Sequence, residues 1–212
     1  MITVQSFEFN YFQENTFLLY DETGEAVLID CGCCRKNEEK RLQEYISLHN
    51  LTLKHLLCTH LHLDHVWGNQ FITQTYGLNP KAHRSDVEIL PPPNEQSKML
   101  GLGIEVTNVP IESFLTDNEI IHFGNSQLQV LTIPGHSPGS VAFYSKENNF
   151  VIVGDALFAG SIGRTDLWGG NTNELITAIR SKLFTLPDHT IVYPGHGSQT
   201  SIIKEKKENP YL

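Results

Sequence analysis

The sequence predicts a mixed fold of the α/β (α+β) class. Short apolar or alternating runs that end in glycine-rich or polar turns are typical of strands, and longer stretches with helical periodicity separate these runs. The composition, 40% hydrophobic and 18% charged, is that of an ordinary globular protein without disordered segments. With 212 residues, the chain can bury a substantial core, and we expect a single domain over residues 1–212.

The predicted elements follow one another in two halves. In the first half we expect strands at residues 2–9, 16–20, 26–30 and 53–59, and helices at 37–49 and 66–76, with Gly77 ending the second helix. The second half is expected to be rich in strands over residues 120–153, helical over 173–184, and to close with a strand and a short helix.

Residues 79–102 predict no single element. The three prolines at positions 91–93 oppose regular structure there, and the stretch through GLG at 101–103 indicates a mobile loop or a helix insertion. Such a segment could form part of a substrate rim.

The most informative segment is HLHLDH at residues 60–65, which contains three imidazoles and one carboxylate. These groups are suitable ligands for zinc, iron or manganese. Without a cation, the same segment would place ionisable groups close together with no compensating charge. One ion can hardly take all four side chains from so short a stretch. We therefore predict two metal ions, with His60 and His62 facing one, and Asp64 and His65 facing the other. A histidine-rich surface loop is the alternative, and the candidate ligands further along the chain disfavour it.

Three of these candidates follow predicted strands, each in a glycine-rich turn. They are His136 in PGHSPGS, Asp155 in VGDALF and His196 in YPGHG. A scaffold commonly positions catalytic residues at strand ends, and a charged group at the end of a buried strand needs a partner. Each motif alone is weak, but together with residues 60–65 they complete two three-ligand sites and one bridging carboxylate.

The motifs THLHLDH, PGHSPG, GDALF and YPGHG, in this order, resemble those of the metallo-β-lactamase superfamily. An aspartate at position 155, where the β-lactamases carry cysteine, resembles the glyoxalase II (hydroxyacylglutathione hydrolase) branch, and GSIGRTDLWGG resembles its short bacterial members. The resemblance implies a four-layer αββα sandwich. It also implies that His60, His62 and His136 bind the first metal, that Asp64, His65 and His196 bind the second, and that Asp155 bridges them.

The activity implied by the resemblance is metal-dependent hydrolysis, and the favoured substrates are thioesters such as S-lactoylglutathione. Two divalent ions, zinc by default with iron or manganese possible, would lower the pKa of a bridging water so that hydroxide is the nucleophile. Asp64 and Asp155 are the predicted catalytic carboxylates, and Asp64 could orient the water. No GxSxG motif offers a serine nucleophile.

Substrate contacts are less well marked. Arg164 falls near a glutathione-binding lysine of the long glyoxalase II enzymes and is the predicted substrate contact, although pairing with Asp166 is an equally good interpretation. The long enzymes place an acidic residue and a tyrosine after the last metal histidine, where this chain has Gly197 and Ser198. Their C-terminal helical domain is also expected to be absent here.

Two other functions remain open. A persulfide dioxygenase of the same fold would hold one iron with His60, His136 and Asp155, and the remaining candidate ligands would then have no direct role. A metal-binding module without turnover is the alternative of another class. A lactonase or β-lactamase is less favoured, the latter because a sulfur ligand is missing.

The net charge of the chain and the absence of an evident targeting signal indicate which binding partners and which cellular compartment to expect. The net charge of −9 argues against a nucleic-acid partner, and the basic run KEKK at 204–207 is expected to be a solvated helix face. No signal peptide or membrane span is evident, so we expect a cytoplasmic protein, monomeric or homodimeric, that acts on a small molecule without a membrane. Its four cysteines, three of them at Cys31, Cys33 and Cys34, are expected to be reduced thiols.

Overall fold

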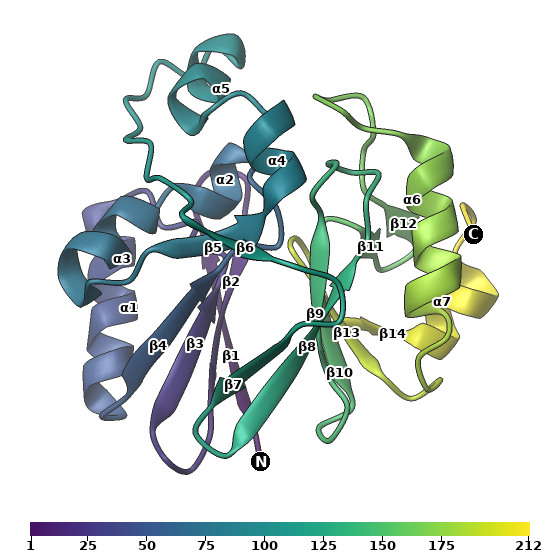
Figure 1. Ribbon diagram of the computed structural model, residues 1–212, viewed down its shortest axis with the longest axis horizontal. Helices are drawn as coiled ribbons and strands as arrows, with labels where there is room; N and C mark the ends of the chain where they lie inside the picture. Colours follow the sequence, from purple (N-terminus) through teal and green to yellow (C-terminus); the bar gives the residue numbers. More distant parts are fainter.

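A computed structural model describes residues 1–212 and contains two six-stranded sheets that pack face to face (Figure 1). The first sheet has the order β1 (Thr3–Phe9), β2 (Glu14–Tyr20), β3 (Glu25–Ile29), β4 (Thr52–Leu57), β5 (Pro80–His83) and β6 (Ser113–Leu115). The second has the order β14 (Thr200–Ser201), β13 (Ile191–Pro194), β10 (Phe150–Gly154), β9 (Val141–Ser145), β8 (Ser126–Thr132) and β7 (Ile120–Phe123). A hairpin of β11 (Leu157–Phe158) and β12 (Ser161–Ile162) stands apart.

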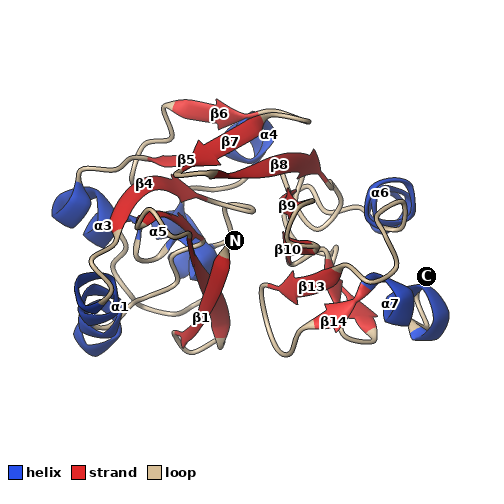
Figure 2. Cartoon of the chain, turned by 90° about the horizontal axis from the view of Figure 1, so that it is seen from below, coloured by secondary structure: helices blue, strands red, loops and turns tan.

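Helices cover the outer faces of both sheets (Figures 1 and 2). The helices are α1 (Lys36–Leu48), α2 (Leu63–Val66), α3 (Asn69–Tyr76), α4 (Arg84–Ile89), α5 (Pro93–Met99), α6 (Thr172–Ala178), the π-helix η1 (Ile179–Leu183) and α7 (Ile202–Glu208). Helices α1 and α3 pack on the first sheet, and α6, η1 and α7 pack on the second. The predicted four-layer αββα sandwich is therefore confirmed.

The central core lies between the two sheets and joins them. Its fifteen buried hydrophobic residues come from both sheets, Phe17 and Ile29 from the first, and Phe143 and Ile152 from the second. Alternating strand residues face this layer, while their neighbours face the outer helices, as expected for a sheet buried on both faces. This shared core supports the expectation of a single domain, which stays a prediction.

The predicted helix over residues 66–76 is wrong in one respect, because the structure has two helices there. α2 begins earlier, at Leu63, and α3 begins at Asn69. Between them the amide of Gly68 donates to the carbonyl of Cys31 at 2.7 Å, a tertiary hydrogen bond that diverts the chain. Gly77 ends α3 with φ of 69°, as predicted.

Of the two interpretations of residues 79–102, the helix insertion agrees with the structure, whereas the expectation that all three prolines oppose regular structure is wrong for Pro93. The segment contains β5, α4 and α5, and Pro93 is the first residue of α5. Proline is tolerated at that position because the first amide of a helix has no intrahelical partner. The predicted helix over 173–184 is present as α6, which continues as η1.

The expected solvated face of KEKK agrees with the structure, because its three lysines are exposed on α7. All four cysteines are free. None of the helices has the length and apolar character needed to span a bilayer.

Asp21 joins the turn after β2 to the turn between β7 and β8. Its carboxylate accepts hydrogen bonds from Thr23 N and Oγ1, from Asn125 N at 2.7 Å and from Ser126 Oγ at 2.8 Å. Burial raises the pKa of this carboxyl group, but the hydrogen bonds from Thr23 and the other donors outweigh burial and lower the pKa from 3.8 to about 2. The carboxylate thus links the turn after β2 in the first sheet to the β7–β8 turn in the second sheet.

We expect Asp21→Asn to lower the free energy of unfolding by about 1–3 kcal/mol at pH 7, because an amide cannot accept all four hydrogen bonds. Since the folded pKa lies below the unfolded one, this contribution is complete above about pH 4 and is lost as the pH falls through about 2. Urea unfolding of both proteins at pH 7 and pH 3 checks this. An equal difference at both pH values would contradict it.

Candidate metal centre

Four strands of the two sheets bring the predicted site residues to one end of the sandwich. β4 leads into residues 60–65, β8 leads to His136, β10 leads to Asp155 and β13 leads to His196. All seven predicted ligand side chains come together there.

The first group is His60, His62 and His136, all less than 7% exposed. His136 Nε2 lies 2.8 Å from His62 Nδ1 and 3.3 Å from His60 Nε2. Three imidazole nitrogens that converge at such distances form the ligand set expected for zinc or iron.

The second group is Asp64, His65 and His196. His196 Nε2 lies 3.2 Å from Asp64 Oδ2 and 3.3 Å from His65 Nε2. Asp64 and His65 lie in α2, which begins directly after His62, and His65 also lies close to the first group, because His60, His65 and Asp155 form a further set of converging ligand atoms. The division of residues 60–65 between two metal ions therefore stays a prediction.

Asp155 lies between the two groups. Its Oδ1 is 3.4 Å from His65 Nε2, and its Oδ2 is 3.7 Å from His136 Nε2 and 3.5 Å from His196 Nε2. Oδ1 is buried without a hydrogen-bond partner. A buried carboxylate oxygen without a partner is unfavourable, and a cation at this point would compensate it.

The second nitrogens of the histidines fix which ring nitrogen faces the site. His136 Nδ1 lies 2.7 Å from the carbonyl oxygen of Arg164, and His196 Nδ1 lies 2.9 Å from the carbonyl oxygen of Phe12. A carbonyl oxygen only accepts, so both Nδ1 atoms carry the proton. In the neutral rings, both Nε2 atoms then present a lone pair to the centre, as a metal ligand must.

Asp30 and Thr59 orient two of the three remaining rings in the same way, whereas the third, His62, has its Nδ1 toward His136 and its Nε2 buried without a hydrogen-bond partner. His65 Nδ1 lies 3.0 Å from Asp30 Oδ2, and Thr59 Oγ1 donates to the same oxygen at 2.7 Å. Since the hydroxyl proton of Thr59 is used there, its oxygen accepts from His60 Nδ1 at 3.0 Å. His60 and His65 thus also present Nε2 lone pairs to the site, and the donor set fits divalent metal ions.

The charges of the site agree with this fit. Burial lowers the pKa of His65, but the carboxylates of Asp155 and Asp64 outweigh it and raise the pKa well above its usual value. For Asp155, burial raises the pKa, while His65 and the other histidines lower it, so that the group is ionised. The carboxylates therefore favour positive charge at the centre, whether a proton or a metal ion provides it.

The first group has the opposite tendency. Burial lowers the pKa of His62 to about 3, and His136 adds to this effect. Burial also holds the pKa of His60 well below its usual value. These two imidazoles are therefore neutral, which is the form that binds metals.

Asp86 and Gln96 hold the ligand segments in place, although no sequence pattern indicated either. Asp86, 1% exposed, accepts from the amides of Leu61 and Gly139 and from the hydroxyl of Ser137. It thereby links residues 60–65 to the turn that carries His136. Gln96 accepts from Leu63 N and donates to Leu61 O, which fixes the same segment from α5.

A pocket of about 240 Å³ opens onto the centre. One part of its wall is apolar and consists of Phe12, Leu63, Leu100, Leu167 and Trp168. The other part is polar and consists of His62, Asp64, Gln96, His136, Asp155, Arg164 and His196. Leu100 and Gln96 belong to the segment expected to form a substrate rim. The pocket can place an apolar group and a carbonyl against the metal-site residues.

Arg164 has the partner that the alternative interpretation assigned to it. Its Nε and Nη2 donate to the two carboxylate oxygens of Asp166 at 2.7 and 2.8 Å. The guanidinium is mostly exposed and also lines the pocket. Its predicted contact with substrate stays a prediction.

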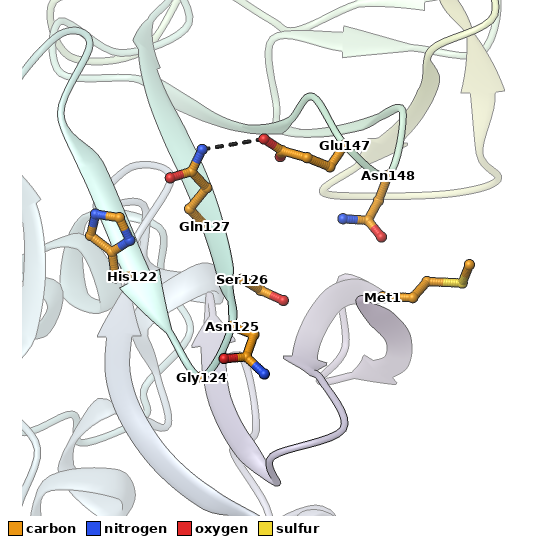
Figure 3. Close-up of a pocket in the computed structure, with 8 residues that line it drawn as sticks. All are labelled: Met1, His122, Gly124, Asn125, Ser126, Gln127, Glu147 and Asn148. Atoms are coloured by element: carbon orange, nitrogen blue, oxygen red, sulfur yellow. Dashed lines mark hydrogen bonds between the residues drawn. The ribbon is translucent and has the colours of Figure 1, made fainter.

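The largest surface cavity, about 520 Å³, lies between the β7–β8 and β9–β10 turns, away from the metal-site residues (Figure 3). Its wall is almost entirely polar, and Gln127 donates to Glu147 across it at 3.3 Å. No set of converging ligand side chains lies there. The pocket at the metal-site residues is therefore the better candidate for chemistry.

Gly195 provides a test of how tightly Asp155 is held. A Cβ atom at Gly195 would overlap Asp155 Oδ1 and would lie 2.7 Å from His65 Cε1. We expect Gly195→Ala to weaken zinc binding by about 10- to 100-fold, the range typical of lost support around metal ligands. Competition with a chromophoric chelator measures this. Gly197→Ala is the comparison for strain without overlap, because a Cβ there meets nothing within 4 Å but a φ of 72° makes alanine unfavourable beside His196. A zinc affinity of Gly195→Ala no lower than that of Gly197→Ala would contradict the steric argument.

Comparisons with known proteins agree with this geometry. Residues 10–196 match the model of the metallo-beta-lactamase superfamily. "Hydroxyacylglutathione hydrolase GloC" of Haemophilus influenzae is 37% identical over 95% of this chain and 93% of its own length. "Probable metallo-hydrolase YqgX" of Bacillus subtilis is 36% identical over 94% of this chain and 92% of its own length.

Three solved structures are similar over nearly the whole chain. BLEG-1, described as a B3 metallo-beta-lactamase, has a TM-score of 0.89 at 32% identity and covers 100% of this chain and 99% of its own. TTHA1623 in a di-iron-bound form has a TM-score of 0.83 at 33% identity, with 99% and 100% covered. ETHE1 from Myxococcus xanthus has a TM-score of 0.78 at 28% identity, with 98% and 83% covered.

Proposed function

Because the chain belongs to the metallo-beta-lactamase superfamily, we propose that it is a dinuclear metal-dependent hydrolase of thioesters, with S-lactoylglutathione as the representative substrate. The observation that carries this proposal is the position of Asp155 between two complete three-ligand groups. The 37% identity to a hydroxyacylglutathione hydrolase supports the choice of thioesters.

The proposed ligands of the first ion are His60, His62 and His136, those of the second are Asp64, His65 and His196, and Asp155 would contact both. Divalent ions bound there would activate water for attack at neutral pH and polarise the substrate carbonyl. Zinc is the default ion, and the di-iron form of TTHA1623 makes iron a second choice.

The role of the surrounding residues is positional. Asp30, Thr59 and two backbone carbonyls keep four imidazoles in one tautomer and one orientation, so that no reorganisation is needed when substrate binds. Asp64, which lies 3.2 Å from His196 and lines the pocket, is the proposed residue that orients the attacking water.

The pocket fits an acyl thioester better than a whole glutathione molecule. At about 240 Å³ it is smaller than the cavities of roughly 300–1,000 Å³ that enclose drug-sized ligands, so most of the thiol part would lie outside it. Leu167 and Trp168 provide an apolar wall for the acyl chain. A thiolate leaves without prior protonation, so the proposal requires no general acid.

Arg164 is the proposed contact for a carboxylate of the thiol part. Its guanidinium lies at the pocket and is held by Asp166 in a bidentate pair. An arginine that is already oriented loses less freedom when it binds an anion.

The test is metal content by elemental analysis together with turnover of S-lactoylglutathione on the same sample. We expect about two metal ions per chain and thioester hydrolysis that is lost on treatment with a chelator and restored by added metal. About one iron per chain, no hydrolysis and oxygen uptake with glutathione persulfide would instead support a dioxygenase that uses His60, His136 and Asp155. Full metal occupancy without turnover of thioesters, lactones or persulfides would leave a binding module.

β-Lactam hydrolysis is a second candidate for the same site. The favouring observation is the 32% identity and TM-score of 0.89 to a protein described as a B3 metallo-beta-lactamase. A chromogenic cephalosporin belongs in the same assay, and a higher kcat/KM for it than for S-lactoylglutathione would reverse the order of the two candidates.

A further inference from the structure

The apolar part of the pocket at the metal-site residues extends from the interior to the surface. Leu63 at the start of α2 is buried, whereas Phe12 in the β1–β2 turn and Leu100 after α5 are 43% and 45% exposed. Leu167 and Trp168 precede α6, and the Trp168 ring lies edge-on to the ring of His62, with centroids 6.1 Å apart. The apolar surface therefore begins directly beside a proposed metal ligand.

Gln96 lines the same pocket but has no hydrogen to donate to a substrate. Its Oε1 accepts from Leu63 N at 3.0 Å, and its Nε2 donates to Leu61 O and to Pro91 O, each at 2.8 Å. Both N–H bonds of the amide are thus in use. Since the residue is 1% exposed, it presents almost no polar surface to a ligand.

The candidate metal ligands are occupied as well. His136 and His196 donate from Nδ1 to backbone carbonyls, and their Nε2 atoms face the proposed ions. His62 Nε2 and Asp155 Oδ1 have no hydrogen-bond partner, but both atoms are buried, so a group bound in the pocket cannot reach them. Asp64 is the proposed partner of the attacking water.

Arg164 is the one polar side chain of the pocket with unused N–H groups. It is 60% exposed and pairs with Asp166, and its proposed partner is a carboxylate of the thiol part, outside the pocket. A hydroxyl on the acyl group would therefore leave water without gaining a side-chain partner. Burial of a hydroxyl without a hydrogen bond is unfavourable, whereas burial of a methylene group is favourable.

On the basis of the proposed hydrolysis of thioesters, we infer that the preferred substrates carry a short, apolar acyl group without a 2-hydroxyl. S-propionylglutathione and S-lactoylglutathione differ only in that hydroxyl, so they form a matched pair. An apolar pocket discriminates against an added hydroxyl by up to about 100-fold. The pocket would therefore accept lactoyl thioesters but favour propionyl and butyryl thioesters.

The first test is kcat/KM of the metal-loaded protein for the S-acetyl, S-propionyl, S-butyryl and S-lactoyl derivatives of glutathione. Each value is divided by the rate of hydrolysis by hydroxide alone, because a 2-hydroxyl also changes the reactivity of the carbonyl. We expect the propionyl derivative to exceed the lactoyl derivative by about 10- to 100-fold. From acetyl to butyryl we expect a rise of about fourfold for each methylene group.

Binding of thioethers, which are not hydrolysed, provides a second readout that does not depend on turnover. S-propylglutathione and S-(2-hydroxypropyl)glutathione reproduce the same matched pair without the carbonyl. In calorimetric titrations of the metal-loaded protein, we expect S-propylglutathione to bind about tenfold more tightly, because its partner must bury an unpaired hydroxyl.

Leu167→Ala tests whether the acyl group packs against the apolar part of the pocket. It should lower kcat/KM for the butyryl derivative several-fold more than for the acetyl derivative. Leu78→Ala is the control, because Leu78 is also half-buried but packs against the outer core of the first sheet, away from the pocket. It should affect both derivatives equally. The acyl series and the thioether pair use the unaltered chain, so the test does not depend on the folding of either variant.

The outcomes separate the substrate class from the proposed function. Turnover that favours the lactoyl over the propionyl derivative, or tighter binding of the hydroxylated thioether, would overturn the inferred substrate class and leave thioester hydrolysis intact. The same factor for the acetyl and butyryl derivatives in Leu167→Ala would also overturn the inferred substrate class. No turnover of any of the four thioesters would overturn both the substrate class and the proposed function.

Discussion

Replacing Asp155 by alanine is expected to give a protein that has lost most of its bound metal and about 1,000-fold in kcat/KM for S-lactoylglutathione. Asp155 faces both ligand groups at 3.4–3.7 Å, so its loss weakens both proposed ions at once. The stabilisation that metal ions give to a developing negative charge amounts to several kcal/mol, which corresponds to a rate factor of this size. Elemental analysis after gel filtration and steady-state kinetics measure the two effects.

Asp64→Ala is the matched comparison, because Asp64 contacts only the second group. It is expected to retain about one metal ion per chain and to lose activity. If the protein instead held a single iron on His60, His136 and Asp155, Asp64→Ala would leave the metal content unchanged, while Asp155→Ala would abolish it. The pair of variants thus separates the hydrolase from the dioxygenase without relying on a substrate. Full retention of both metals by Asp155→Ala would contradict both arrangements.

The seven candidate ligands could be predicted from the sequence because metal-binding residue types occur there in short motifs at the ends of predicted strands. A run such as HLHLDH is difficult to bury without a cation, and the structure brings it together with His136, Asp155 and His196. Asp30 follows a buried strand just as Asp155 does, and this signal was available. Its partner, however, is the far nitrogen of His65, which is known only once β3 and β4 are seen side by side.

Asp86 could not have been predicted in this way. Two of its three partners are backbone amides, of Leu61 and Gly139, and any residue type at those positions would offer the same donors. The break between α2 and α3 has the same origin, since it follows from a hydrogen bond between Gly68 and Cys31, 37 positions earlier in the chain. Local periodicity carries no information on such distant backbone contacts.

Asp30 offers the second large effect, since one buried carboxylate accepts three hydrogen bonds beside the metal centre. Oδ1 accepts from Thr59 N at 2.7 Å, and Oδ2 accepts from Thr59 Oγ1 at 2.7 Å and from His65 Nδ1 at 3.0 Å. Asp30→Asn must direct its NH₂ group at one of these donors, whichever way the amide is turned. We expect zinc affinity to fall by about 10- to 100-fold and the free energy of unfolding to fall by about 1–3 kcal/mol.

Asparagine is the suitable substitution because it removes the charge of Asp30 without changing the backbone conformation at this position. Asp30 has φ of 52°, a region that asparagine also adopts readily, whereas alanine would add strain of its own. Glu205→Gln is the control for stability alone, because Glu205 is a carboxylate 1% exposed that accepts hydrogen bonds from Thr200, Gly160 and Asn209, and it is not among the candidate ligands. A comparable loss of stability in both variants, with weaker zinc binding only in Asp30→Asn, would assign to Asp30 the positioning of His65. Equal zinc affinities would mean that Asp30 supports the fold but not the metal centre.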